Sequence, residues 1–384
     1  MRPPTLCTLL ALTLLASGAS AIYEDQAGQY DWLKQNVGRV SLAQLAPRPR
    51  PRLVVASEAG VVAALSPRDG TLLWRRVLPE GRGAPTYLEL AGNRVLTLSD
   101  GGCLLEAMDI DSGRLLWALE LWATEEETLG AAPGVALLGA GVGARVAVAL
   151  GSSLRVFAVD SGRQLGSDEL AAGAAQTVLA AEGGQAWAAS LLGSGGLAVA
   201  AIAPDGSVAQ RVRLGSPAAL RADGLAISSA GVAALSADGT QLCSGGVSGD
   251  GTLACRPLAD LLPSGASAMG AALRGGPAGH LVLQMDGGAA LLQLAGGHAK
   301  LIHFAPGGTA SAPAPTESDG EAVLGLATPS PQGLRLAVLS AADGSELTAG
   351  VVAGLQPTRV DGSLVGVDRL FLARWKKADG ATLR

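Results

Sequence analysis

Two stretches of this 384-residue chain repeat one another without gaps. They run from Ala64 to Trp74 and from Ala107 to Trp117, and both place Ala, Gly and Trp at the same three positions. A third stretch, Val156 to Gly166, keeps an Asp-Ser-Gly turn but lacks the Trp. When weaker Asp-Gly copies are included, turn glycines recur about every 46 residues, at Gly70, Gly113, Gly162, Gly206, Gly239, Gly287 and Gly344.

A repeat of this length is the size of one four-stranded β-propeller blade. The Asp-Gly and Ser-Gly pairs supply the positive φ that a tight hairpin needs. A Trp after the turn can pack between neighbouring blades, while the small Ala suits a crowded position within a blade. One blade cannot cover both of its faces, so blades must stack around an axis. The sequence therefore predicts an all-β propeller with about seven blade-sized repeats, whose structural blade residues are Ala64, Gly70, Trp74, Ala107, Gly113, Trp117 and Gly162.

Composition excludes two classes of protein. The net charge of −5 argues against a nucleic-acid binder, which needs a basic face to neutralise phosphates. The hydrophobic content of 48% argues against disorder. We therefore expect a folded protein with no nucleic-acid partner.

The first 21 residues have the order of a secretory signal peptide. Arg2 supplies the positive charge, Leu6 to Leu15 is a short apolar stretch, and Ala19-Ser20-Ala21 is a small-residue cleavage site. The alternative is an apolar helix buried in the fold. The signal-peptide interpretation predicts a mature chain, residues 22–384, that forms one propeller domain in a lumenal or extracellular compartment. No later stretch is typical of a membrane-spanning helix.

The cysteines permit one disulfide within the mature chain. Cys7 leaves with the signal peptide, and Cys103, Cys243 and Cys255 remain. Cys243 and Cys255 flank a glycine-rich segment typical of a hairpin loop, and an oxidising compartment would join them. The alternative is two unpaired buried thiols. Cys103 would then be free or would pair with another chain.

The spacing of Ala, Gly and Trp resembles the pyrroloquinoline-quinone-like (PQQ-like) repeat, which occurs in quinoprotein dehydrogenases, bacterial outer-membrane assembly lipoproteins and lumenal domains of endoplasmic reticulum (ER) proteins. The stretch after the cleavage site, Tyr23-Glu24-Asp25-Gln26-Ala27-Gly28-Gln29-Tyr30-Asp31-Trp32, is more specific. It resembles the start of the mature chain in the family of ER membrane protein complex subunit 1. The resemblance covers about residues 22–120 closely, and the rest mainly through the propeller pattern.

This resemblance implies a function and partners. It implies a non-enzymatic lumenal scaffold in a complex that inserts and stabilises tail-anchored and multipass membrane proteins. The partners would be the other subunits of that complex, together with membrane-protein clients or lumenal chaperones. Family members are much longer and carry a membrane helix near the C-terminus, so the chain is expected to be a fragment of an ER protein. Whether the propeller closes within these residues is left open.

Two other functions share the repeat. A quinoprotein-type oxidoreductase would need a carboxylate base, calcium ligands and often adjacent cysteines, and the sequence has no adjacent cysteine pair. Many of its aspartates stand in Asp-Gly turns, where a turn-forming role is the simpler interpretation. His298 and His303 have no third ligand nearby, so we expect no catalytic residue, cofactor or metal. A lumenal sensor or assembly factor that binds unfolded chains is the other alternative.

Trp32 lies outside the repeats and has two interpretations. It docks the leading segment onto the propeller, or it contacts a partner subunit. The sequence does not decide between them.

Overall fold

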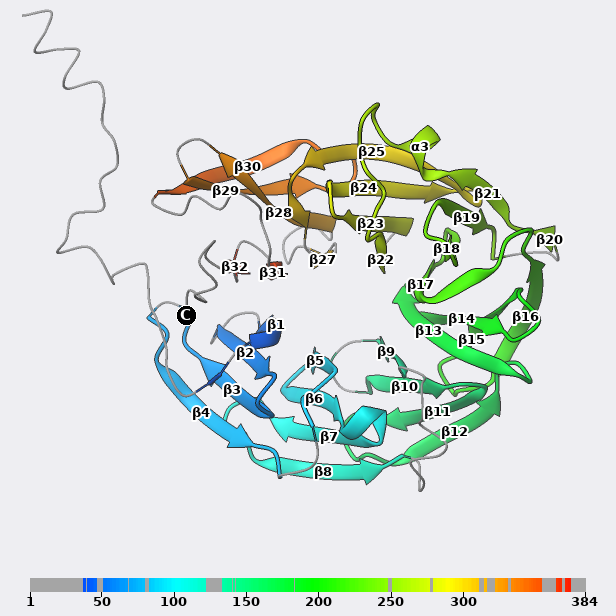
Figure 1. Cartoon of the computed structure of the whole chain (residues 1–384). Coiled ribbons are helices and arrows are strands. Elements are labelled where there is room, and N and C mark those ends of the chain that lie inside the picture. Colours follow the sequence, from blue (N-terminus) through cyan, green and yellow to red (C-terminus); the bar gives the residue numbers. More distant parts are fainter. Residues whose placement is uncertain are drawn as a thin grey trace, which may run out of the picture.

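The computed structural model describes residues 37–373 apart from short gaps, of which 122–132 and 354–363 are the longest. It is a β-propeller with seven blades of antiparallel strands, arranged as a ring (Figure 1). In each blade the first strand lies nearest the centre and the last lies at the outer edge. The sequence prediction of an all-β propeller with about seven blades is confirmed.

The strands of the first four blades follow in chain order. They are β1 (Val40–Ala46), β2 (Arg52–Ser57), β3 (Val61–Leu65) and β4 (Leu72–Val77) in blade 1; β5 (Tyr87–Ala91), β6 (Arg94–Ser99), β7 (Leu104–Asp109) and β8 (Leu115–Glu120) in blade 2; β9 (Gly134–Leu138), β10 (Arg145–Leu150), β11 (Ser153–Ala158) and β12 (Gln164–Glu169) in blade 3; and β13 (Ala174–Glu182), β14 (Gln185–Leu192), β15 (Leu197–Ile202) and β16 (Val208–Gly215) in blade 4.

The remaining blades are less regular. They are β17 (Leu220–Ser228), β18 (Gly231–Ser236), β19 (Gln241–Gly245) and β21 (Ala254–Pro257) in blade 5; β22 (Ala272–Gly275), β23 (His280–Met285), β24 (Gly288–Ala295) and β25 (His298–Pro306) in blade 6; and β26 (Thr309–Ala310), β27 (Ala314–Pro315), β28 (Ala322–Ser330), β29 (Gly333–Ser340) and β30 (Glu346–Ala353) in blade 7. Two short helices, η1 (Asp100–Gly102) and α3 (Leu258–Leu261), lie between strands, and β20 (Gly251–Thr252) pairs with β16 of blade 4.

Burial follows the position of a strand within its blade. β3 is buried along its whole length, because a middle strand is covered on both faces by the neighbouring blades. β4 at the outer edge has mostly exposed residues, with Trp74 buried among them. The apolar runs of the middle strands therefore form the core, and the outer strands form the rim.

A β-bulge recurs in six blades. The register between the third and fourth strands shifts by one residue at Ala64/Leu65, Ala107/Met108, Val156/Phe157, Ala201/Ile202, Leu291/Leu292 and Val338/Leu339. In five of these blades the shift comes just before the turn that joins the two strands, whereas in blade 6 it lies in the middle of β24. A bulge increases the local twist and turns the following side chains toward a new direction. Blade 5 lacks this shift between β19 and β21.

The turn glycines are not all equivalent. Gly70, Gly113, Gly162, Gly206 and Gly344 lie between the third and fourth strands of their blades and have positive φ values. Gly239 and Gly287 instead lie between the second and third strands of blades 5 and 6. The interpretation of all seven as one repeated position was therefore wrong for these two. Asp-Gly fits any tight turn, so the dipeptide marks a turn without saying which one it is.

The apolar core is divided between the blades. Six clusters of buried residues each join two neighbouring blades, from blades 1 and 2 around to blades 6 and 7. A seventh cluster covers only the other face of blade 1. Strands β31 (Leu364–Val367) and β32 (Leu370–Ala373) form a separate hairpin in the space between blades 7 and 1, which we call the eighth sector (Figure 1). There β31 contacts both β28 and β1.

Candidate functional site

The repeated Ala and Trp residues are partners across a strand pair. Ala64 of β3 lies directly opposite Trp74 of β4, and Ala107 of β7 lies opposite Trp117 of β8. Both alanines are fully buried. A larger residue there would compete with the indole ring for the space between the blades. The constant spacing in the sequence is therefore the length of one hairpin, with the turn glycine between its two partners.

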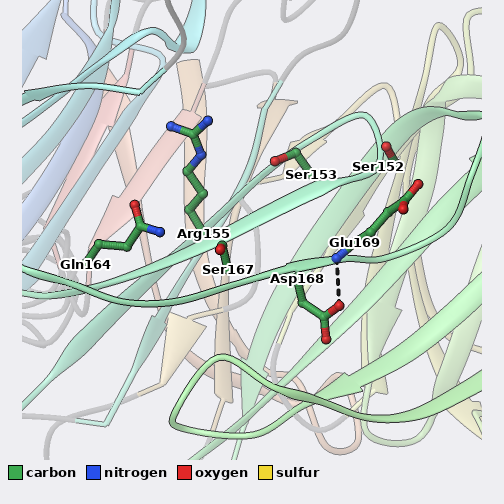
Figure 2. Close-up of a pocket in the computed structure, with 7 residues that line it drawn as sticks. All are labelled: Ser152, Ser153, Arg155, Gln164, Ser167, Asp168 and Glu169. Carbon is green, nitrogen blue, oxygen red and sulfur yellow. Dashed lines mark hydrogen bonds between the residues drawn. The ribbon is translucent and has the colours of Figure 1, made fainter.

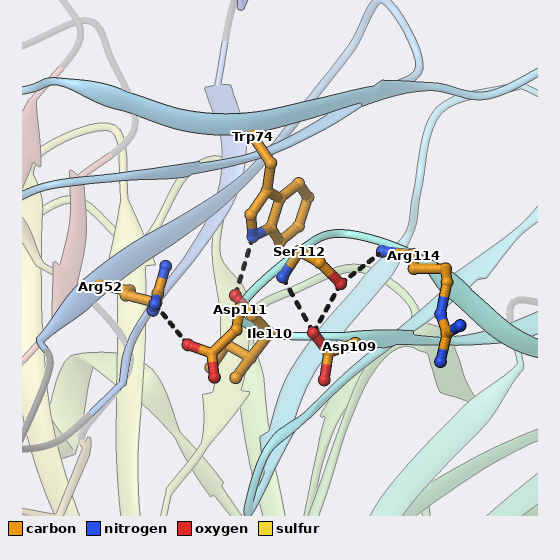
Figure 3. A network of polar contacts seen from close by, with 7 residues as sticks. All are labelled: Arg52, Trp74, Asp109, Ile110, Asp111, Ser112 and Arg114. Carbon is orange, nitrogen blue, oxygen red and sulfur yellow. Dashed lines mark hydrogen bonds and ion pairs between the residues drawn. The ribbon is translucent and has the colours of Figure 1, made fainter.

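Each of these tryptophans packs against the turn of the next blade. A Cβ atom built on Gly113 would lie 2.6 Å from the indole of Trp74, and one on Gly162 would lie 2.8 Å from the indole of Trp117. The indole Nε1 of Trp74 donates a hydrogen bond to the carbonyl oxygen of Ile110 at 2.8 Å (Figure 3). That of Trp117 donates to Val159 at 3.0 Å. In both cases the acceptor stands three residues before the turn glycine.

Polar contacts surround the Trp74 contact between blades 1 and 2. Arg52 forms an ion pair with Asp111, and the backbone N–H and hydroxyl of Ser112 donate to Oδ1 of Asp109 (Figure 3). Deeper in the interface, Arg76 lies 3.6 Å from the carboxylate of Glu106, whose side chain is buried. These groups align the two blades and hold the turn that receives the indole.

The aspartates of the Asp-Gly turns bind backbone amides of their own turns. The N–H of Thr71 donates to Asp69 at 3.0 Å, and that of Thr240 donates to Asp238 at 3.1 Å. The hydrogen bond from Thr71 lowers the pKa of Asp69 to about 2. The hydrogen bond from the Ser236 hydroxyl, with smaller contributions from those of Thr240, lowers the pKa of Asp238 to about 2. These exposed carboxylates therefore stabilise turns, which is the role that their sequence context indicated.

Cys243 and Cys255 lie opposite each other on β19 and β21, where the structure joins them in a disulfide. The loop between them contains β20, which leaves blade 5 and pairs in parallel with the outer strand β16 of blade 4. Leu253 follows β20, is buried, and donates its N–H to Gly215 at 2.8 Å. The sequence predicted the cysteine pair but not the contact of its loop with the neighbouring blade. Cys103, at the end of η1, is a half-buried free thiol.

Glu89 is a candidate residue that the sequence did not reveal. It lies on β5, the innermost strand of blade 2, and accepts a long contact of 3.5 Å from the amide of Gln44 on β1. Burial raises the pKa of Glu89 from 4.5 to about 7. Strand alternation places a side chain at this position but does not predict its environment, so no sequence signal could have identified it.

A polar hollow lies on the outer part of blade 3 (Figure 2). It has a volume of about 610 Å³ and is lined by Ser152, Ser153, Arg155, Gln164, Ser167, Asp168 and Glu169. Asp168 accepts a hydrogen bond from Arg211 of blade 4 at 3.0 Å. Small-molecule sites are mostly apolar with a few polar groups, whereas every residue lining this hollow is polar. Its chemistry fits contact with a polar surface better than enclosure of a ligand.

The histidines do not assemble into a metal site in the described part of the chain. His280 is buried on β23, and His298 and His303 lie on β25. No group of three or more histidine, cysteine or acidic side chains close enough to hold a metal occurs among the described residues. The predicted motif Tyr23, Glu24, Asp25, Gln26, Gly28, Asp31 and Trp32, and the predicted signal peptide, lie outside those residues.

Residues 21–382 match the family described as the EMC1 N-terminal beta-propeller domain. The chain belongs to this family. It is also similar to ER membrane protein complex subunit 1 of Gallus gallus, with 38% identity over 112 residues, and of Xenopus laevis, with 35% identity over 118 residues. These alignments cover 28% and 30% of this chain but 11% and 12% of those proteins. The matched part is thus a small share of the length of these relatives.

Solved structures that resemble the EMC1 N-terminal propeller share its fold. The computationally designed Ika8 protein has a TM-score of 0.52 at 17% identity, covering 91% of this chain and 98% of that one. The C-terminal WD40 domain of Sif2 has a TM-score of 0.52 at 14% identity, covering 85% and 88%. In the described part of this propeller, no helix is long and apolar enough to cross a membrane.

Proposed function

We propose that this chain is the lumenal propeller of the first subunit of the ER membrane protein complex, and that it acts as a non-enzymatic scaffold there. The match over residues 21–382 to the EMC1 N-terminal propeller family carries the proposal. In this role the propeller holds other subunits in place while the complex inserts and stabilises tail-anchored and multipass membrane proteins. Clients or lumenal chaperones would contact its exposed loops.

The construction of the blades supports a scaffold. Buried clusters join each described blade to the next, from blade 1 to blade 7, and indole rings add to them between blades 1 and 2 and between blades 2 and 3. The ring is therefore a stiff body with loops on both faces. The titratable groups with shifted pKa values are explained by turns, by burial within the ring or by ion pairs such as that of Arg221 with Asp223. The carboxylates of Asp69 and Asp238, for example, are engaged by backbone amides of their own turns.

A pull-down tests the role in the complex. The full-length protein, with a tag at its C-terminus, is isolated from detergent-solubilised membranes in its native form and as the Trp74→Ala/Trp117→Ala variant. The scaffold role predicts that the native protein recovers a stoichiometric set of membrane subunits and that the variant recovers less. Recovery of misfolded clients without those subunits would support the sensor alternative. Turnover after addition of quinone and calcium in a dye-coupled assay would support the oxidoreductase.

An engineered glycosylation site tests the lumenal location. Neither Asn36 nor Asn93 is followed by the residues of an acceptor sequon. Gly265 lies in an exposed loop with open space around it, and Gly265→Asn creates an Asn-Ala-Ser sequon with Ser267. Because Asn tolerates the left-handed conformation found there, the fold should persist. We expect a mass increase that an endoglycosidase removes and that Ser267→Ala abolishes. A variant that stays unmodified in cells would contradict a lumenal propeller.

A further inference from the structure

A group of polar side chains is buried between blades 1 and 2. Thr97 of β6 and Glu106 of β7 lie directly opposite each other. Ser99 follows two residues after Thr97, so all three lie on the same face of blade 2. Val95 precedes Thr97 on that face and packs in the cluster shared with blade 1. The polar residues therefore face blade 1, where Arg76 of β4 lies 3.6 Å from the carboxylate of Glu106.

Two of these side chains are completely shielded from solvent. Thr97 and Ser99 each have 0% exposure, and neither hydroxyl oxygen has a hydrogen-bond partner among the described residues. The same holds, in the described part of the chain, for the buried Nε of Arg76. Alternate residues on a strand lie roughly 7 Å apart, so the two hydroxyls do not pair with each other. Because buried hydroxyls are nearly always hydrogen-bonded, these must bond to a group other than the described residues.

The interface between blades 3 and 4 shows how such hydroxyls are satisfied by the protein itself. Thr177 of β13 and Ser190 of β14 lie opposite each other, and their hydroxyl oxygens are 2.8 Å apart. Thr177 also donates to the carbonyl oxygen of Gly151 at 2.7 Å. In blade 2 the innermost strand instead places Leu88 opposite Thr97. The hydroxyl of Thr97 therefore has an apolar neighbour where Ser190 has a second hydroxyl.

The charges around the two hydroxyls favour a neutral ligand. Arg76 and Glu106 carry opposite charges, so the site has no excess charge that would select an ion. Their separation of 3.6 Å is longer than a direct hydrogen bond, which is a spacing that water often bridges. Hydroxyl groups both donate and accept, as water does. The side chain of Arg76 is 29% exposed, so it connects the buried hydroxyls with solvent.

We propose that the interface between blades 1 and 2 contains a buried hydration site, in which ordered water bonds the hydroxyls of Thr97 and Ser99 and links them to the pair of Arg76 and Glu106. Buried water that makes several hydrogen bonds is a structural part of a protein. Blades 1 and 2 are then joined by direct contact around Trp74 and through water around Thr97. This proposal does not depend on the function of the complex.

A density map tests the hydration site directly. The full-length protein is studied within its complex by cryo-electron microscopy, at a resolution that shows ordered water elsewhere inside the propeller. We expect density within hydrogen-bond distance of the hydroxyl oxygens of Thr97 and Ser99. If these hydroxyls bond to another segment of the protein, the proposal is overturned. A map that shows water in other buried places but none beside these two residues would overturn it as well.

The sign of a stability change provides a second test. Thr97→Val keeps the shape of the side chain and removes the hydroxyl. Because bound water would lose a partner, the equilibrium constant for unfolding should rise roughly fivefold, and the density beside residue 97 should disappear. Thr97→Ser retains the hydroxyl and should retain the density. Urea unfolding of the full-length protein measures the stability of each variant.

Thr177→Val is the matched control for Thr97→Val. It removes a buried hydroxyl whose partners are known, so its constant for unfolding should also rise. If Thr97→Val leaves this constant unchanged or lowers it while Thr177→Val raises it, the hydroxyl of Thr97 binds no water and the proposal fails. A rise in both variants, with loss of density only beside the substituted residue 97, is the result that we expect.

Discussion

At the scale of the residue, the ring depends on a few large side chains placed against glycine. Trp74 is only 9% exposed, whereas its neighbour Leu73 on the same strand is 43% exposed. The difference arises because the indole enters the next blade while Leu73 remains on the rim. Because Trp74 and Leu73 are neighbours on one strand, comparing substitutions at the two positions separates the loss of inter-blade packing from a general effect on the strand.

Trp74→Ala should lower the free energy of unfolding by about 3–5 kcal/mol, as large core truncations do. Trp74→Phe should cost less, because it keeps one aromatic ring in the interface and loses the second ring and the donor to Ile110. Leu73→Ala is the matched control and should change stability by about 0.5 kcal/mol or less. Urea unfolding followed by circular dichroism measures all three. Equal effects of Trp74→Ala and Leu73→Ala would refute the inter-blade role.

Glu89 should make stability depend on pH. Its pKa rises from 4.5 to about 7 on folding because the fold removes much of the side chain from water. Between these values the folded chain holds a proton that the unfolded chain has lost, so stability is fully present below pH 4.5 and falls as pH rises to about 7. Between pH 4.5 and 8 the free energy of unfolding of the native chain should fall by about 3 kcal/mol, whereas that of Glu89→Gln should not show this fall. Thermal unfolding over this pH range measures both. Parallel pH profiles of the two proteins would show that Glu89 does not carry it.

At the scale of the element, the third and fourth strands with their turn are the unit that repeats. Bulge, alanine and tryptophan form one hairpin in blades 1 and 2, which made the repeat visible in the sequence. Blade 5 departs from it, since β19 and β21 are joined by a disulfide and their loop pairs with blade 4. Here a disulfide joins the two strands within the blade, and the pairing of β20 with β16 connects blade 5 to blade 4.

The Cys243–Cys255 bond can be tested directly. Peptide mapping without reduction should link the two cysteines and leave Cys103 as a thiol. Closure of a loop with a sequence separation of 12 is expected to stabilise the fold by about 3 kcal/mol, so the Cys243→Ser/Cys255→Ser variant should unfold at lower urea. Cys103→Ser serves as the control and should unfold as the native chain does. Two free thiols at 243 and 255 would contradict the pairing.

At the scale of the whole molecule, the two ends of the ring meet at the eighth sector. Ala327 and Val338 of blade 7 are buried without belonging to the cluster shared with blade 6, and blade 1 has its own buried cluster facing this sector. Both faces therefore depend on what lies between them, including β31 and β32.

Removal of residues 354–384 should expose these two faces. We expect the shortened chain to bind the dye ANS and to self-associate on a sizing column, because large apolar patches drive association. A chain that ends after residue 373 retains β31 and β32 and is the matched control. Should the two chains behave alike and stay monomeric, the hairpin would not cover the faces of blades 1 and 7.

The sequence allowed the fold to be predicted because turn chemistry survives where bulky residues have been replaced by small ones. The Asp-Gly pairs and two tryptophans were enough to predict the length of one blade. The burial of the middle strands then follows from the stacking of the blades around an axis. The same turn chemistry misled at Gly239 and Gly287, since it does not distinguish one hairpin of a blade from the next. The environment of Glu89 and the crossing of β20 depend on contacts between blades, which no local pattern encodes.

The crossing of β20 also bears on the order in which the chain is made. Domains fold largely from the N-terminus during synthesis. Blade 4 emerges before the loop that contains β20, so the edge strand β16 is available as a template when that loop appears. If Cys243 and Cys255 are oxidised after this pairing, the disulfide closes a loop that is already paired with β16. If they are oxidised before it, the disulfide closes a loop that is not yet paired. We therefore expect the pairing of β20 with β16, which connects blades 4 and 5 at their outer edge, to depend on when the thiols are oxidised relative to translation.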